Sequence, residues 1–264
     1  MTANEMRETF KLLYNGATAV EMEYDDREVG MFLTLAQLDE VHIRMYPNRN
    51  PLGEGLEQSS KRDAELNELK QYVYILPNQT NKSKVYYLDG SLKEQLDDWS
   101  TGKYNNSKLI TLPSDYLYNV QERVDIKYNG TVTYIDVALQ PINEDYIMEA
   151  IENPFHKPEV DRRIYRVIEP RKISARTDTT QSTLTPRRLT IIYGTNVTLD
   201  KYKVTYIRRP LDIIVDTITP TNQRHCELDA SIHQAIVERA VSRALGAIGS
   251  QKYQVGINER DNLT

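Results

Sequence analysis

The C-terminal quarter decides the fold: Lys203–Asp216 reads KVTYIRRPLDIIVD, and Asp229 opens the run DASIHQAIVERAVSRALGAIG, which ends at Gly249. The first run is rich in β-branched and aromatic residues, which favour strands. In the second, Asp229 suits a helix N-cap, and apolar residues recur at helical spacing: Ile232, Ile236, Val237, Ala240, Val241, Ala244, Leu245 and Ile248. The pattern predicts a strand, a polar connection through His225–Asp229 and an amphipathic helix over about 229–249.

The rest of the chain changes character near residue 71. Before it, helical spacing predicts helices over residues 3–14, 35–46 and 57–71, the second capped by Thr34. After it, short strands are expected over residues 72–76, 84–88, 108–112, 120–128, 132–139, 163–168, 189–193 and 204–215. Asn129-Gly130 is a hairpin turn signal between two of them. The predicted fold class is α+β, with N-terminal helices, a strand-rich antiparallel middle and a C-terminal amphipathic helix.

Length and composition predict one elaborated domain over residues 1–264, with a helical part of about 1–71, a strand-rich part of about 72–218 and the C-terminal helix. A chain of 264 residues can bury a substantial core. Its hydrophobic content of 39% is low, and 18 tyrosines against 3 phenylalanines and 1 tryptophan make up much of its apolar surface. Tyrosine suits half-buried strands and protein interfaces, so both readings stay open.

Charge and cysteine usage exclude several classes of protein. The 33 basic and 38 acidic side chains give a net charge of -5, which argues against a protein whose whole surface binds nucleic acid. With Cys226 as the single cysteine, the chain has no disulfide and no cysteine-based zinc site. The N-terminus lacks signal-peptide features and no apolar run approaches a membrane span, so we expect a protein made in the cytoplasm without a membrane partner.

Motifs for catalysis, phosphate binding and metal binding are missing, so we expect no enzyme, no catalytic residue, no metal and no cofactor. Glycines do not fall in GxGxxG, GxxxxGK[ST] or GxSxG patterns. The four histidines form no HxH, HxxxH or HExxH pair. We expect Cys226 to be a buried apolar residue and His233 to lie on the solvated side of its helix. A hydrolase assembled from distant residues is a further hypothesis, which a concave pocket with convergent titratable groups would support.

One charge feature stands out. Residues 161–188 carry eight basic side chains against three acidic ones, a balance of +5, whereas residues 1–68 carry fourteen acidic and seven basic ones, a balance of -7. The basic stretch is either a solvated face with local salt bridges or a set of inter-subunit or inter-ring contacts. The candidate contact residues are Arg162, Arg163, Arg166, Arg171, Lys172, Arg176, Arg187 and Arg188.

Several phrases of the sequence resemble one family. They are Tyr206-Ile207-Arg208-Arg209-Pro210, Cys226-Glu227-Leu228, His233–Val241, Asn258-Glu259, Leu112–Leu117 and Asn153–Pro158. Together they resemble neck and tail ring proteins (head-to-tail adaptors or connectors) of short-tailed bacteriophages, particularly of crAss-like phages. The order of helices first, strands next and helix last matches that family as well.

The resemblance implies a virion structural protein that forms a ring in the neck or tail, between the portal and the tail nozzle. Its expected partners are further copies of itself in a closed ring, most simply a dodecamer, the portal and other ring proteins, and double-stranded DNA in transit through the channel. It leaves open whether the ring is a portal-proximal adaptor or a lower tail ring. The alternative is a cytoplasmic nucleic-acid-binding accessory protein that uses residues 161–188.

Overall fold

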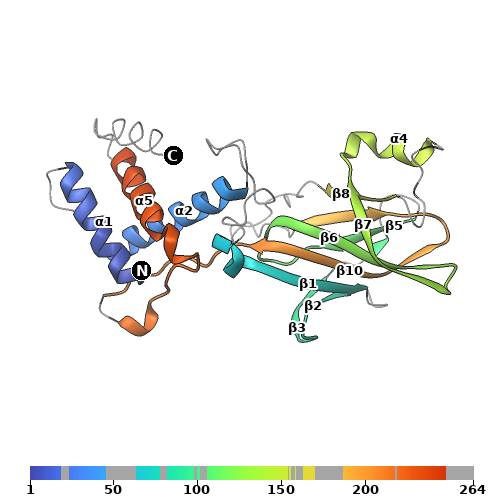
Figure 1. Cartoon of the computed structure of the whole chain (residues 1–264), viewed down its shortest axis with the longest axis horizontal. Coiled ribbons are helices and arrows are strands. Elements are labelled where there is room, and N and C mark those ends of the chain that lie inside the picture. Colours follow the sequence, from blue (N-terminus) through green and yellow to red (C-terminus); the bar gives the residue numbers. More distant parts are fainter. Residues whose placement is uncertain are drawn as a thin grey trace, which may run out of the picture. The chain divides into compact units, whose positions relative to one another are not determined.

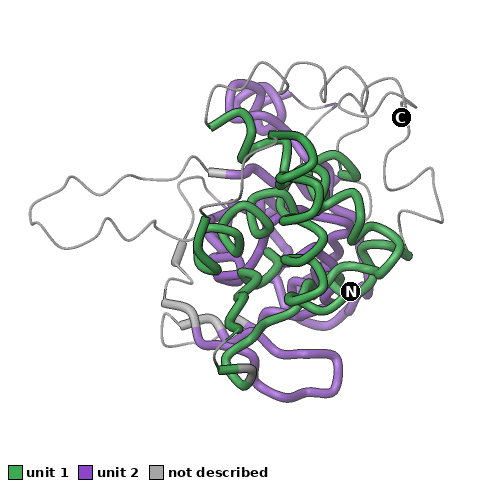
Figure 2. The backbone as a smooth tube through the Cα atoms, turned by 90° about the vertical axis from the view of Figure 1, so that its left-hand side faces the viewer, with its two compact units in different colours: residues 1–70, 209–264 green, residues 71–208 purple. Residues whose placement is uncertain are grey.

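The computed structural model describes residues 1–18, 24–45, 64–77, 82–97, 100–101, 106–153, 155, 158, 163–169, 187–217 and 219–247. The chain divides into two compact units, a helical unit of residues 1–70 and 209–264 and a strand unit of residues 71–208 (Figure 2). The chain therefore leaves the helical unit once and returns to it. That the whole chain unfolds as one domain stays a prediction.

The described part of the helical unit contains three α-helices: α1 (Ala3–Thr18), α2 (Asp26–Met45) and α5 (His233–Ala247), which follows the short 3-10 helix η6 (Ala230–Ile232) (Figure 1). A second short 3-10 helix, η3 (Asn67–Leu69), precedes the strands, and η5 (Pro220–Asn222) precedes α5. Alanine, methionine and aromatic residues line the buried side of α1, where the rings of Phe10 and Tyr14 stack at 6.0 Å.

The start of α2 differs from the prediction. A helix from Leu35 with Thr34 as N-cap was expected, but α2 begins nine residues earlier at Asp26. The cause is a reciprocal cap: Glu28 N donates to Asp25 Oδ1 at 2.7 Å, and Asp25 N donates to Glu28 Oε2 at 3.0 Å. Thr34 lies inside the helix, and its hydroxyl accepts a bond from Ile213 N at 2.9 Å.

The C-terminal helix is confirmed. Asp229 accepts a hydrogen bond from Ser231 N at 2.8 Å, so it caps the turn that leads into α5. The buried residues of α5 include Ile236, Val237 and Val241, which share the predicted apolar face. The described helix ends at Ala247, and the last expected residues lie outside the described part of the chain.

Within the described residues, ten strands form one mixed sheet in the order β3-β2-β1-β10-β6-β7-β8-β9-β5-β4. They are β1 (Lys70–Pro77), β2 (Lys82–Tyr87), β3 (Leu92–Asp97), β4 (Ser100–Thr101), β5 (Ser107–Thr111), β6 (Tyr116–Tyr128), β7 (Val132–Pro141), β8 (Ile164–Glu169), β9 (Arg188–Ile192) and β10 (Val197–Arg208). The predicted α+β class is confirmed. Neighbouring strands run antiparallel in the registers that the structure defines, except that β7 and β8 are parallel.

The sheet folds into two layers because β7 belongs to both of them. Its first part pairs with β6, and Leu139–Pro141 pairs with β8. Between these parts Asp136 has a φ of 58°, and the register with β6 shifts, as at a β-bulge. The inner faces of the layers share one core, which includes Val73, Ile126, Ile191 and Tyr202. A short helix, α4 (Ile147–Glu152), follows a 3-10 turn, η4 (Glu144–Tyr146), and lies outside this core.

The predicted hairpin turn between β6 and β7 is confirmed. Asn129 and Gly130 both have positive φ values, 49° and 72°, as the two central residues of a type I′ turn require. Thr131 N donates to Tyr128 O at 3.1 Å and closes the turn. Its twist matches that of the two long strands it connects.

Two sequence predictions near the unit boundary are wrong. The strand expected to reach Val215 ends at Arg208, and the residues beyond it form a single bridge between Ile214 and Arg224. The helix expected over residues 57–71 ends earlier than predicted: residues 64–65 are helical, but residues 67–69 form η3 and Lys70 opens β1. Residues 57–63 lie outside the described part.

Candidate assembly surface

The predicted basic contact residues fall into two groups. Arg162, Arg171, Lys172 and Arg176 lie outside the described residues, whereas Arg163, Arg166, Arg187 and Arg188 belong to β8, to β9 or to residues next to these strands. Arg166 points into the strand unit: its Nε lies 2.9 Å from Glu122 Oε2, and its side chain is 13% exposed. In this unit Arg166 balances an interior carboxylate, which leaves little of its charge at the surface.

The other described arginines are half-buried. Arg187 donates to Leu117 O at 3.0 Å, and its guanidinium lies 6.0 Å from the centre of the Tyr116 ring. Arg163 donates to Phe155 O. These side chains thus anchor β8 and β9 to neighbouring loops and strands. They keep their charge, and part of each remains accessible to another molecule.

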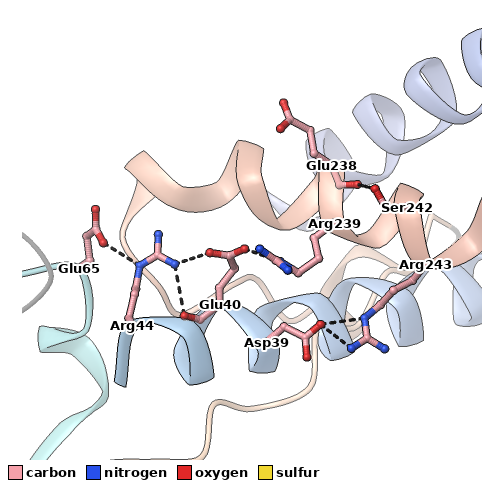
Figure 3. A network of polar contacts seen from close by, with 8 residues as sticks. All are labelled: Asp39, Glu40, Arg44, Glu65, Glu238, Arg239, Ser242 and Arg243. Atoms are coloured by element: carbon pink, nitrogen blue, oxygen red, sulfur yellow. Dashed lines mark hydrogen bonds and ion pairs between the residues drawn. The ribbon is translucent and has the colours of Figure 1, made fainter. Parts of the chain in front are cut away.

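Three acidic side chains of the N-terminal part form ion pairs inside the helical unit (Figure 3). Glu40, 3% exposed, accepts from Arg44 of its own helix and from Arg239 Nε of α5 at 2.5 Å. Arg44 Nε also donates to Glu65 Oε2 at 2.7 Å. Asp39 pairs with Arg243 of α5. These ion pairs tie α2 to α5, so Asp39, Glu40 and Glu65 are satisfied without a second copy of the chain.

Two phrases that carry the family resemblance meet inside the strand unit. The ring of Tyr116, from the Leu112–Leu117 phrase, stacks on that of Tyr206 at 5.3 Å. The Tyr206 hydroxyl donates to Asp115 Oδ1 at 2.8 Å, and Lys93 Nζ lies 2.7 Å from the other oxygen of that carboxylate. Lys93 is 9% exposed and comes from the edge strand β3. Burial and the bond to Asp115 raise the pKa of Tyr206, so it stays a hydrogen-bond donor.

A second interior cluster surrounds Glu122 of β6. Burial raises the pKa of Glu122 to about 7, although Arg166 opposes the shift. Burial, followed by the nearby Glu122 charge, also raises the pKa of Tyr202 and of Tyr116. Within the described residues, neither carboxylate oxygen of Glu122 nor the Tyr202 hydroxyl has a hydrogen-bond partner, despite the close ion pair with Arg166. Such a buried carboxyl makes stability depend on pH near neutrality.

We predict that Glu122→Gln removes a pH dependence of stability. The folded-state pKa is raised from about 4.5, so the carboxyl binds its proton more tightly in the folded protein, and stability falls as the pH rises from about 5 to 8. The unfolding free energy of the variant, relative to the unsubstituted chain, should therefore increase by about 3 kcal/mol over this range. Urea unfolding at pH 5, 6.5 and 8 measures it. Parallel pH profiles for the two chains would contradict the assignment.

His233 does not lie on a solvated helix face, as was expected, but is 5% exposed. Its Nε2 donates to Leu228 O at 2.8 Å, because the turn before α5 folds back over the start of the helix. His225 accepts a bond from Ala3 N at 3.0 Å and so ties the turn to α1. His225 therefore connects the N-terminal and C-terminal segments of the helical unit.

The remaining groups that could carry chemistry are the Cys226 thiol and possible metal ligands. Burial raises the pKa of the Cys226 thiol to about 11, so the thiolate is scarce at neutral pH. The described residues contain no cluster of three His, Cys, Asp or Glu side chains placed to hold a metal ion. In the same part of the chain, the helices are too short or too polar to cross a bilayer.

Comparison with known proteins defines the class: this is a structural protein of a bacteriophage. Residues 1–255 match the family model described as phage tail ring protein 3/4, and the chain belongs to that family. It is similar to ring protein 4/5 of Bacteroides phage crAss001, with 25% identity over 98% of this chain and 99% of that protein. It is also similar to ring protein 3 of the same phage, with 25% identity over 93% and 95% of the two chains. The family suggested by the sequence phrases is confirmed.

Proposed function

We propose that this protein forms a closed homo-oligomeric ring in the neck or tail of the phage particle, between the portal and the tail nozzle, and that DNA passes through its channel. The match to the tail ring family over residues 1–255 carries the proposal. The ring acts as a structural connector and not as an enzyme. Twelve copies, which would match a portal ring, are the expected number.

Exposed apolar side chains provide area for contacts with other subunits. Large hydrophobic residues are well exposed on both units, among them Leu12 (75%), Met31 (58%), Leu88 (75%), Ile135 (68%) and Phe155 (83%). Single exposed apolar residues are ordinary on a monomer, but larger exposed groups mark interaction surfaces. Within a ring, each copy presents one face to the copy before it and a different face to the copy after it.

Particle shape and size test the proposal directly. Purified protein should give rings of uniform diameter by negative-stain imaging, and native mass spectrometry should give one closed copy number. A protein that stays monomeric at high concentration, and when mixed with its neighbouring ring proteins, would contradict the proposal. If the protein instead acts as a nucleic-acid-binding accessory factor, it should bind free duplex DNA with an affinity that falls steeply with salt.

The basic contact residues remain part of the proposal. We predict that Arg187→Glu combined with Arg188→Glu weakens ring formation at low salt, because reversed charges repel a complementary acidic surface of an adjacent subunit or ring. Salt screens that repulsion, so assembly should recover partly at high salt. Native mass spectrometry across a salt series measures this. Arg27→Glu with Arg224→Glu, two exposed arginines of the helical unit, is the matched control. Unchanged assembly of the first variant at every salt concentration would leave these arginines as ordinary surface residues.

A further inference from the structure

The outer face of the β1-β2-β10 layer carries tyrosines and lysines. Side chains alternate along each strand, so Val73, Ile75 and Val85 point into the core while Tyr74 and Tyr86 point outward. The rings of Tyr74 and Tyr86 are directly paired across the strands and stack at 5.3 Å, with an angle of 13° between their planes.

Two lysines flank these rings. Lys201 Nζ of β10 lies 5.7 Å from the centre of the Tyr74 ring. Lys84 lies opposite Leu76 in the β1-β2 register, on the same outer side as Tyr86. The outer face also holds Lys203, but two carboxylates neutralise it, Asp125 at 2.8 Å and Asp136 at 2.9 Å. We call Tyr74, Tyr86, Lys84 and Lys201 the tyrosine-lysine face; its side chains are half-exposed.

The opposite outer face of the strand unit is covered by α4. Ile147 and Ala150 pack on Tyr165, Val167 and Ile192, which are the outward residues of β8 and β9. This cluster is separate from the core between the layers. Figure 1 shows α4 and the β1-β2-β3 strands on opposite sides of the strand unit.

The outward side of α4 is acidic and apolar. Between Asn143 and Asn153 the chain has four acidic residues and no basic one. Glu149 and Glu152 are exposed, and so are two large apolar side chains, Tyr146 at 59% and Met148 at 55%. We call these four residues the α4 face. It combines apolar contact area with negative charge, whereas the tyrosine-lysine face combines aromatic area with positive charge.

We infer that the tyrosine-lysine face of one copy docks on the α4 face of the next copy. This inference rests on the proposed ring, and it names one contact within it. The two faces are opposite in charge, both contain half-exposed or exposed aromatic surface, and they lie on opposite sides of one unit. A contact between two unlike faces of the same chain is heterologous, and such a contact closes into a ring when the rotation between copies allows. Aromatic residues inside a rim of complementary charge are typical of protein interfaces.

Charge reversal on either face tests the contact. Lys84→Glu with Lys201→Glu leaves both faces acidic, and Glu149→Lys with Glu152→Lys leaves both basic. Each variant alone should need about a tenfold higher protein concentration for half-assembly, because opposite charges at the contact become like charges. An equimolar mixture should assemble as the unsubstituted chain does, because every contact between the two variants again joins opposite charges. Native mass spectrometry with one variant isotopically labelled should show the two chains alternating in equal numbers.

Controls separate this inference from the proposed function. Circular dichroism and melting must show that both variants are folded, and Lys84→Glu and Glu149→Lys as single changes give smaller effects in the same direction.

If both double variants form rings as readily as the unsubstituted chain, the inference fails and the proposed ring stands. If each variant is impaired but the mixture does not recover, these faces do not meet each other, and the inference fails again. If Lys84→Glu with Lys201→Glu abolishes binding of duplex DNA and leaves assembly unchanged, the tyrosine-lysine face is a DNA surface. If the unsubstituted chain forms no ring, the proposed function and this inference fall together.

Discussion

Glu40→Ala should lower the unfolding free energy by about 3 to 5 kcal/mol, a large share of the stability of a typical domain. Glu40 is 3% exposed, and its carboxylate lies between two cations that are themselves largely buried, Arg44 and Arg239. Truncation leaves Arg239 without this partner and opens a small void between α2 and α5. Urea unfolding followed by circular dichroism measures the loss.

Asp39→Ala is the matched control, because it removes the neighbouring ion pair on the same helix. Its partner Arg243 is 40% exposed, so water replaces much of the lost interaction. We expect a loss of less than about 1 kcal/mol. The network in Figure 3 thus predicts that the adjacent carboxylates of Glu40 and Asp39 contribute very differently to the unfolding free energy. Equal losses for the two variants would show that Glu40 is better solvated than its contacts indicate.

Patterns in short stretches of the sequence predicted the elements that are determined by residues close together in the chain. The amphipathic helix α5 follows from the spacing of its apolar residues and from Asp229, and the β6-β7 turn follows from Asn129-Gly130. The early start of α2 also has a local signal, the cap formed by Asp25 and Glu28, but the pattern of apolar residues drew the prediction to Thr34 instead. The Asp25–Glu28 cap can be recognised in the sequence. Such a cap determines where the helix begins, even though the apolar pattern becomes clear only further along the chain.

The missed strand β3 has a different cause. Its sequence, Leu-Lys-Glu-Gln-Leu-Asp over residues 92–97, lacks β-branched and aromatic residues, so propensity gives no strand signal. Pairing with β2 and the contacts of one buried lysine hold it in place. Lys93 donates to Gln71 at 2.6 Å and to Asp115, both distant in sequence. Tertiary contacts override local propensity here, and no window of the sequence contains them.

The basic stretch shows the limit of counting charges. Its net charge of +5 can be counted from the sequence, but the ion-pair partner of each side chain cannot. Arg166 pairs with Glu122 of another strand, and Glu40 and Asp39 of α2 pair with Arg239 and Arg243, about 200 positions further along the chain. The tyrosine-lysine face and the α4 face were missed because their residues come from separate strands or from a short helix that had not been predicted. Tyrosine enrichment was the one sequence signal for the first of them.

Val241→Asp should destabilise the helical unit by about 3 to 5 kcal/mol at neutral pH. Val241 is 6% exposed and lies on the buried face of α5 with Val237 and Ala244. A carboxylate there loses its hydration in an apolar environment, and the carboxyl responds by an upward shift of its pKa. The neutral form of the carboxyl is less costly than the carboxylate, so the loss should be smallest at low pH and should grow as the pH rises through the shifted pKa.

Two comparison variants isolate the cause of this loss. Val241→Asn has nearly the same shape as the aspartate variant but no charge, so the difference between the two at pH 8 measures the charge itself. Gln234→Asp places a carboxylate on the exposed side of the same helix and should change stability by no more than about 0.5 kcal/mol. Thermal melting at several pH values measures all three variants. If Val241→Asp melts and assembles like the unsubstituted chain at pH 8, α5 does not bury this face, because a carboxylate that keeps its water carries no such cost.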